Sequence, residues 1–213
     1  YSNLIELMAN KKADDRLFDQ INSADVNRYL QEMMPGLTAK VFRTYNASSL
    51  FEKELNKIRK KYPTAPGIDY HSNMDDIIHQ FNMANVKVAG LCNHQKNVAA
   101  ICKVPASIEK MKEKVTESES KLQALIDSND TDAKIKRAKT SLDKLKQKQS
   151  LQKAMKNIAL VTSKISYIDP RISAAFMKEY NIPINRIFSK TLQQRFAWSL
   201  NDQSANNYKF NIV

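Results

Sequence analysis

The sequence predicts a mainly α protein with a helical subdomain, an antiparallel coiled-coil hairpin and a small helical C-terminal domain. Apolar residues recur every three to four positions along most of the chain, which is typical of amphipathic helices. The 213 residues include only three glycines and six prolines, so the chain has little turn chemistry for many β-hairpins. A chain of this length can bury one core and carry an appendage.

The N-terminal part is predicted to contain three short helices. Residues 4–8 and 17–21 each carry apolar side chains at helical spacing. Ser23 can cap a third helix, which the Pro35-Gly36 pair should end.

Two longer helices are expected next. Thr38 can cap the first of them, on which Lys40 and Arg43 lie one turn apart on the polar face. Residues 50–62 are predicted to form a separate, highly charged amphipathic helix.

A further helix should bring a histidine to its C-terminal end. Ser72 and Asp75 have the spacing of a capping box at its start, although Glu or Gln is the usual partner. Apolar residues continue at helical spacing through Leu91. We expect this helix to deliver His94 and to end near Pro105.

Residues 106–157 have a different pattern, with apolar residues at roughly heptad spacing on both sides of the polar turn 127–131. Lys, Glu, Gln and Asp occupy most other positions. Two long helices folded back on each other would bury this narrow stripe, and most of the lysines would lie on a solvated face. The apolar positions are Ile108, Met111, Val115, Leu122, Leu125, Ile135, Ala138, Leu142 and Leu145.

A tyrosine lies immediately before the next predicted helix. Asp169 can cap that helix, and Pro170 suits its first turn, where a missing N–H costs nothing. Tyr167 therefore lies at an elbow, with Lys164 and Arg171 nearby in sequence. The helix then carries an apolar face formed by Ile172, Ala175, Phe176 and Tyr180.

The composition indicates a polyanionic partner. The formal net charge is +12 at pH 7, which suits either nucleic acid or an acidic membrane surface. No apolar stretch has the length of a membrane span, and no signal peptide is visible. Cys92 and Cys102 form no disulfide framework, which fits a reducing compartment, and no zinc-ligand spacing predicts a metal. A chain that begins at Tyr1 is expected to have lost its original N-terminus.

Residues 163–171 have the sequence SKISYIDPR. This run resembles the active-site segment of the eukaryotic DNA topoisomerase I family, the type IB enzymes, in which the tyrosine of Ser-Lys-x-x-Tyr-x-Asp-Pro-Arg is the nucleophile. The resemblance implies that Tyr167 is the catalytic nucleophile.

Three further segments resemble the same family, in the same order along the chain. Residues 36–48 (GLTAKVFRTYNAS) resemble the segment with a catalytic arginine, which implies that role for Arg43. Residues 91–96 (LCNHQK) resemble the catalytic-histidine segment, which implies that role for His94. Lys190-Thr191 with residues 196–198 (FAW) resembles the family tail.

The resemblance implies relaxation of supercoiled double-stranded DNA by single-strand cleavage and religation. Tyr167 would form a 3′-phosphotyrosine bond and free a 5′ hydroxyl. A tyrosine with a pKa near 10 is only about 0.1% ionised at neutral pH, so the surrounding residues must activate it as a nucleophile. Arg43 offers a planar fork for two phosphate oxygens, and His94 can donate to a non-bridging oxygen. We expect no need for ATP or for an obligatory metal.

The same resemblance suggests DNA-binding and drug-site positions. Ser166 stands where the family commonly has asparagine, beside the site of camptothecin-type poisons, and the shorter side chain predicts reduced camptothecin sensitivity. The expected DNA contacts would position the duplex with little base reading. They are Thr38, Ala39, Lys40, Asn93, Thr162, Ser163 and Lys164.

The resemblance also implies three domains and a missing partner. Residues 1–105 would be the C-terminal part of the catalytic core, 106–157 the coiled-coil linker, and 158–213 the C-terminal domain. The family's other catalytic arginine and its general-acid lysine have no match here, so we expect a requirement for the upstream core portion, in the same or a separate chain. The nucleus is the expected location, with a mitochondrial form as the alternative.

Two other functions fit parts of the sequence. A tyrosine recombinase uses a similar arginine, histidine and tyrosine, but no His-x-x-Arg pairing surrounds His94. A catalytically incomplete coiled-coil module that binds DNA would also fit the charge and the hairpin.

Overall fold

The computed structural model describes residues 1–65, 70–96, 102, 104–201 and 208–210. These residues form helices and connecting turns and contain no β-strand, so the prediction of a mainly α fold is confirmed. The chain divides into two compact units, Tyr1–Tyr45 and Asn46–Val213, and each is described by itself. No helix in the described part of the chain is both long and apolar enough to cross a membrane.

The first unit contains α1 (Ser2–Met8), α2 (Ser23–Met33) and the first residues of α3 (Ala39–Lys61). The prediction of a helix over residues 17–21 is wrong, because that stretch forms bends and irregular structure. So short a segment gains too few helical hydrogen bonds to offset nucleation. The start of this stretch is held by Lys11 instead. Its ammonium group donates hydrogen bonds to the backbone carbonyls of Arg16 and Leu17.

The cap of α2 also differs from the prediction. Asn22, not Ser23, is the cap, and its side-chain oxygen accepts hydrogen bonds from the N–H groups of Ala24 and Asp25. The Asp25 carboxylate accepts from the Asn22 N–H in return. This reciprocal capping box places Ser23 inside the helix as its first residue. The expected end at Pro35-Gly36 is confirmed, since α2 ends at Met33.

The core of the second unit lies between α3, α4 (Met74–Leu91) and α9 (Pro170–Glu179). Phe81 of α4 packs edge-on against Phe51 of α3, with ring centroids 5.2 Å apart, and lies 5.5 Å from Phe176 of α9. The predicted helix that carries Arg43 and the separate helix predicted at residues 50–62 are one continuous helix, α3. Residues 46–49 include no glycine or proline that would separate them.

The boundaries of α4 correct two expectations. A short 3-10 helix, η1 (His71–Asn73), precedes α4, and its cap residue makes no side-chain hydrogen bond, so the expected Ser72–Asp75 box does not form. The helix ends at Leu91 and not near Pro105. Pro105 lies in the first turn of α6, where its missing N–H is tolerated. Residues 97–101 are outside the described part of the chain.

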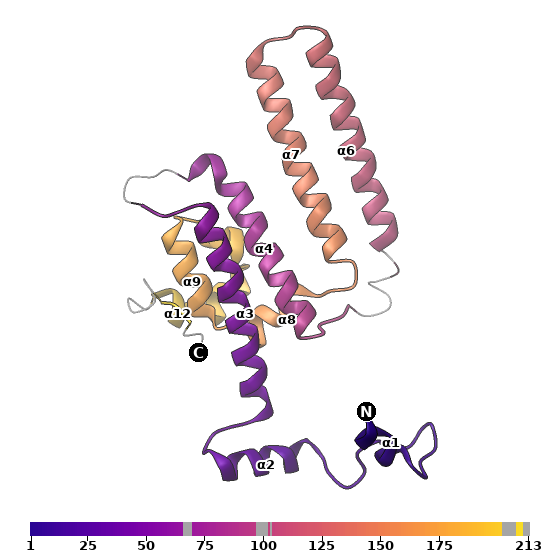
Figure 1. Cartoon of the computed structure of the whole chain (residues 1–213). Helices are drawn as coiled ribbons and strands as arrows, with labels where there is room; N and C mark the ends of the chain where they lie inside the picture. The colour runs from indigo at the N-terminus through magenta and orange to yellow at the C-terminus, as the bar shows by residue number, and fades with distance from the viewer. Residues whose placement is uncertain (66–69, 97–101, 103, 202–207, 211–213) are drawn as a thin grey trace. The chain divides into compact units, whose positions relative to one another are not determined.

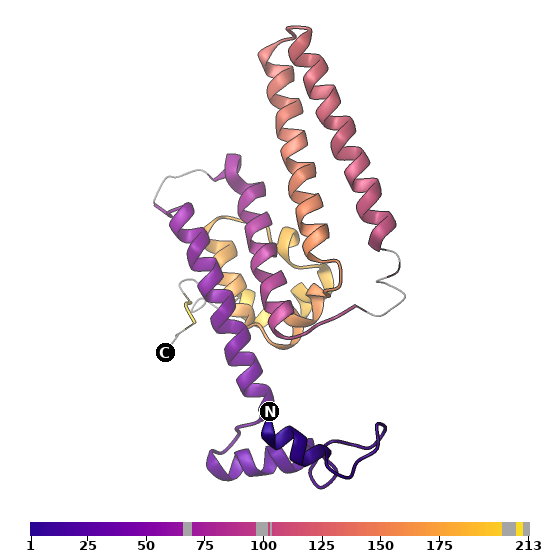
Figure 2. The ribbon, with the colours of Figure 1, turned by 45° about the vertical axis from the view of Figure 1, so that its right-hand side comes forward.

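The predicted hairpin consists of α6 (Val104–Asp127) and α7 (Asp132–Ala154), which run antiparallel side by side in Figures 1 and 2. Its buried residues among those described are Met111, Val115 and Leu142. Helix α7 also contacts α4. The C-terminal part adds four short helices, which are α8 (Leu160–Ser166), α10 (Ile184–Ile187), α11 (Lys190–Arg195) and α12 (Ala197–Asn201).

Candidate active site

Tyr167 lies at the elbow between α8 and α9. Helix α8 ends at Ser166, and Tyr167 leaves the helical conformation with φ −134° and ψ −27°. The Asp169 side chain accepts a hydrogen bond from the Arg171 N–H at 2.9 Å, and Pro170 is the first residue of α9. The predicted cap and the predicted proline position are therefore both confirmed. They set the direction in which the chain leaves the tyrosine.

His94 is brought to Tyr167 by the end of α4. Asn93 adopts a left-handed conformation with φ 53°, which turns the chain after the helix. The His94 N–H donates to the Ala89 carbonyl at 2.9 Å, and the His94 carbonyl accepts from the Ala159 N–H at 2.8 Å. The imidazole then stacks on the Tyr167 ring, with centroids 5.2 Å apart and planes 26° apart.

An isolated bridge fixes the segment that leads from the histidine to α8. Gln95 and Ile158 form an antiparallel bridge. The Lys96 N–H donates to the Asn157 carbonyl at 2.9 Å, and the Lys96 ammonium donates to the Met155 carbonyl at 2.6 Å. Because α8 begins two residues after Ile158, these bonds link the histidine turn to the helix that carries the tyrosine.

Two buried polar residues join α4 to α8. The Ser163 hydroxyl lies 3.0 Å from both the Asn85 side-chain oxygen and the Leu160 carbonyl. The Asn85 amide nitrogen donates to the same Leu160 carbonyl at 3.3 Å. Asn85 and Ser163 are both fully buried, so each satisfies groups that would otherwise be unpaired away from water.

Charged groups surround the cap of α9. The Arg171 guanidinium contacts both carboxylate oxygens of Asp169, at 3.1 Å and 2.6 Å. The Tyr208 hydroxyl donates to the same carboxylate at 3.1 Å, and its ring lies under the guanidinium. Burial opposes ionisation of Asp169, but the hydrogen bonds from Arg171 outweigh it and hold the pKa of Asp169 below its usual value.

Comparison with known proteins identifies the family. Residues 1–129 match the family model of the eukaryotic DNA topoisomerase I catalytic core, and residues 139–210 match that of the C-terminal topoisomerase domain. The chain belongs to the eukaryotic DNA topoisomerase I family.

Several relatives match almost the whole chain. DNA topoisomerase 1 of Drosophila melanogaster is 37% identical over 99% of this chain and 21% of the relative. DNA topoisomerase 1 of Homo sapiens is 37% identical over 99% of this chain and 28% of the relative. DNA topoisomerase 1 alpha of Arabidopsis thaliana is 33% identical over 94% of this chain and 23% of the relative. The chain thus spans about a quarter of the length of these relatives.

The three residues predicted to be catalytic fall in both units of the chain. His94 and Tyr167 lie together in the second unit. Arg43 belongs to the first unit, where it is exposed on α3, as are Ala39 and Lys40. Thr38 precedes α3 and is partly buried. The approach of Arg43 to a phosphate held by His94 and Tyr167 stays a prediction.

The other predicted DNA contacts have different surroundings. Asn93 and Thr162 are exposed, whereas Ser163 is fully buried and its hydroxyl is used inside the protein. Lys164 is partly buried, with its ammonium group 3.5 Å from the Ile187 carbonyl and 5.7 Å from the Phe81 ring centroid. Burial lowers the pKa of Lys164 to about 8. Contact of Asn93, Thr162 and Lys164 with DNA stays a prediction, and the Ser163 hydroxyl already has partners inside the protein.

Sequence reasoning missed three residues that support the site. Asn85 follows Phe81 by one helical turn, and a polar residue on that apolar face could have indicated a buried hydrogen bond. Ser48 was part of a family-like segment but had no assigned role. Tyr208 contacts Asp169 across 39 residues of sequence, and no local pattern predicts that contact.

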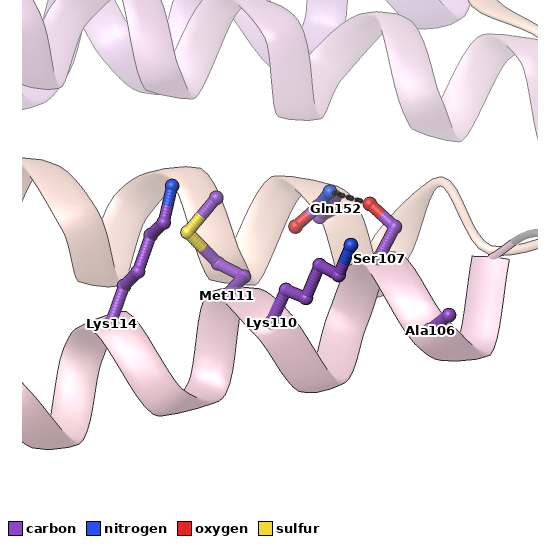
Figure 3. A pocket seen from close by; sticks show the side chains of 6 residues that line it. All are labelled: Ala106, Ser107, Lys110, Met111, Lys114 and Gln152. Atoms are coloured by element: carbon purple, nitrogen blue, oxygen red, sulfur yellow. Dashed lines mark hydrogen bonds between the residues drawn. The ribbon is translucent and has the colours of Figure 1, made fainter.

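The structure also contains a pocket that none of the predicted site residues lines. It lies between α6 and α7, at the end of the hairpin opposite its turn (Figure 3). There the Gln152 amide nitrogen donates a hydrogen bond to the Ser107 hydroxyl, with a donor–acceptor distance of 2.6 Å. Lys110, Met111 and Lys114 complete much of the lining. In the described part of the chain, no group of three or more His, Cys, Asp or Glu residues is placed to hold a metal ion.

Proposed function

We propose that this chain is the C-terminal portion of a type IB DNA topoisomerase that relaxes supercoiled double-stranded DNA. The observation that carries the proposal is the stacking of His94 on Tyr167 at an elbow whose sequence resembles the family's nucleophile segment. The net charge of +12 supports binding of a polyanion. The family's nuclear role supports a nuclear location for this chain.

The reaction is a reversible transesterification. The Tyr167 oxygen attacks the phosphorus and loses its proton to solvent, while the bond from phosphorus to the 5′ oxygen breaks. The products are a 3′-phosphotyrosine and a 5′ oxygen that takes up a proton to become a hydroxyl. After the free strand rotates, the 5′ hydroxyl attacks the phosphotyrosine and restores the DNA, so the bond energy is retained without ATP.

Protein side chains stabilise the negative charge that develops on the non-bridging phosphate oxygens during attack. Arg43 provides two N–H groups in a planar fork for the non-bridging oxygens. His94 donates one further hydrogen bond, and a single well-placed donor of this kind is worth about 3 kcal/mol. With this charge stabilisation supplied by side chains, we propose that neither ATP nor a divalent metal is obligatory.

Full activity requires the upstream core portion of the enzyme, in the same chain or as a separate one. The family's second arginine and its general-acid lysine have no match in this sequence. A second phosphate contact and the proton for the 5′ oxygen would therefore come from that portion. The chain's match to only about a quarter of its relatives is consistent with this division.

The test uses a nicked duplex that loses a short 5′-hydroxyl fragment after cleavage, so that religation is blocked. The chain is incubated with this DNA alone and with an upstream core portion, and covalent adducts are mapped by mass spectrometry. We expect an adduct on Tyr167 that depends on the upstream portion and is lost in Tyr167→Phe, which still binds the duplex. An unmodified Tyr167 in the combined sample, or an adduct on another residue, would contradict the proposal.

Ser166 provides a separate test of drug response. It is the last residue of α8, immediately before Tyr167, and is partly exposed. Its hydroxyl is too short to replace an asparagine amide, so we propose low camptothecin sensitivity. Ser166→Asn in the combined enzyme should increase drug-stabilised cleavage, and an unchanged level of cleavage would remove the support for this role.

A further inference from the structure

We propose that Ser48 is a positioning residue that holds Tyr167 for attack. The inference rests on the proposed function, because it assigns a residue that acts on the nucleophile of that reaction. Ser48 lies on α3, is fully buried, and is separated from the elbow by about 120 residues of sequence. Because its side chain is inaccessible to solvent, it would act only through the backbone on both sides of Ile168.

One hydroxyl makes two hydrogen bonds to the elbow. The Ser48 hydroxyl donates to the Tyr167 carbonyl at 3.2 Å, and its oxygen accepts from the Asp169 N–H at 3.0 Å. A serine hydroxyl has one donor and two acceptor positions, so it can make both bonds at once. The two bonds fix the residue that carries the nucleophile and the residue that caps the next helix.

The elbow needs such a partner because its backbone has left both helices. Tyr167 ends α8 in a non-helical conformation, and Asp169 is the extended cap residue of α9. A carbonyl and an N–H at such positions have no helical partner of their own. Ile168 between them is buried with 5% exposure, so water has little access to satisfy these groups. The Ser48 hydroxyl provides the hydrogen bonds that water would otherwise make to these two backbone groups.

Loss of the hydroxyl should therefore affect attack more than DNA binding. Without it, the Tyr167 carbonyl and the Asp169 N–H each lose the hydrogen bond that ties them to α3, and the backbone of the elbow can shift. A displacement of about 1 Å of a reacting group can cost about 100-fold in rate. We expect Ser48→Ala to lower the cleavage rate at saturating DNA by roughly tenfold or more, with less than a twofold change in the Kd for DNA.

The experiment measures single-turnover cleavage of the nicked duplex by this chain combined with the upstream core portion. Ser48→Ala is compared with Ser48→Thr, which keeps the hydroxyl, and with Ser49→Ala, which removes the adjacent buried serine of the same helix. Each variant is also assayed with a 5′-bridging phosphorothiolate, whose sulfur leaves without a proton. Thermal unfolding and DNA affinity are measured for every protein.

A positioning role predicts that Ser48→Ala is slow on both substrates, that Ser48→Thr recovers most of the rate, and that Ser49→Ala matches the wild type. The inference is overturned if Ser48→Ala cleaves at the wild-type rate, or if Ser49→Ala loses as much activity for the same loss of stability. It is also overturned if the sulfur leaving group restores the rate, because the defect would then lie in protonation. Failure of the wild-type protein to modify Tyr167 would instead refute the proposed function.

Discussion

The elbow region and the helical hairpin belong to the same compact unit but are stabilised in different ways. In the core formed by α3, α4 and α9, Phe51, Phe81 and Phe176 are fully buried, and Phe81 packs against each of the other two rings. In the hairpin, the two helices meet along a narrow apolar stripe and exposed ion pairs such as Lys146–Glu119, at 2.8 Å. Burial of aromatic surface contributes far more to the free energy of unfolding than exposed ion pairs do. We infer that the site is held rigidly, while the hairpin can open locally at lower cost.

The largest effect should come from the aromatic core. Phe81→Ala removes a fully buried ring that contacts both α3 and α9, and should lower the free energy of unfolding by about 3–5 kcal/mol. Leu142→Ala in the hairpin, where the side chain is 6% exposed, is the matched change and should cost less because solvent and neighbours can fill the gap. Chemical denaturation measures both values. Equal losses of unfolding free energy in the two variants would show that the aromatic core is no more important for stability than the hairpin stripe.

The next effect concerns the buried polar pair behind the elbow. Ser163→Ala removes the hydroxyl that lies 3.0 Å from the Asn85 side-chain oxygen, and leaves that oxygen buried without this partner. We expect a loss of about 1–3 kcal/mol. Thr162→Ala, at the adjacent exposed position, is the control and should change stability by less than about 0.5 kcal/mol. A similar result for the two variants would show that the pair adds little.

Lys164 gives a pH-dependent test of the same region. Burial lowers its pKa from 10.5 to about 8, so the unfolded chain binds more protons than the folded chain between these values. The wild type therefore gains stability as the pH rises through this range. Lys164→Met should be more stable than the wild type by up to about 3 kcal/mol at pH 7, and most of this advantage should disappear by about pH 10.5. Thermal unfolding from pH 6 to 10.5 measures the difference. A constant difference would show that Lys164 has a normal pKa.

The smallest effect is expected where the hairpin meets the body. The Lys144 ammonium pairs with Asp75 at 2.9 Å, and Arg186 pairs with the same carboxylate at 2.7 Å. Lys144→Ala should cost at most about 1 kcal/mol, because the ion pair is partly exposed and screened by salt. Hydrogen exchange should show faster exchange in α7 with no change in α9. Lys148→Ala, on the same helix, is the control, and equal effects would show that the Asp75 contact is not specific.

The sequence predicted the parts of this molecule that depend on neighbouring residues. The cap at Asp169, the proline that follows it and the antiparallel hairpin all depend on short-range spacing. The same local reasoning was wrong at one helix cap and at one short segment. Asn22 replaced Ser23 as a cap because it forms the reciprocal bond with Asp25. Residues 17–21 had helical spacing but were too few to form a helix without tertiary support.

The candidate site was also predicted from the sequence, because Tyr167, His94 and Arg43 lie in segments that resemble one family. The tertiary structure alone decided how the first two meet and what holds them. Ser48 reaches the elbow across 119 residues, and Ser163 reaches Asn85 across 78. Serine has no strong preference that reveals such a partner in advance. A hydrogen bond of this kind exists only after packing has excluded water and brought distant backbone groups within 3 Å or so of one hydroxyl.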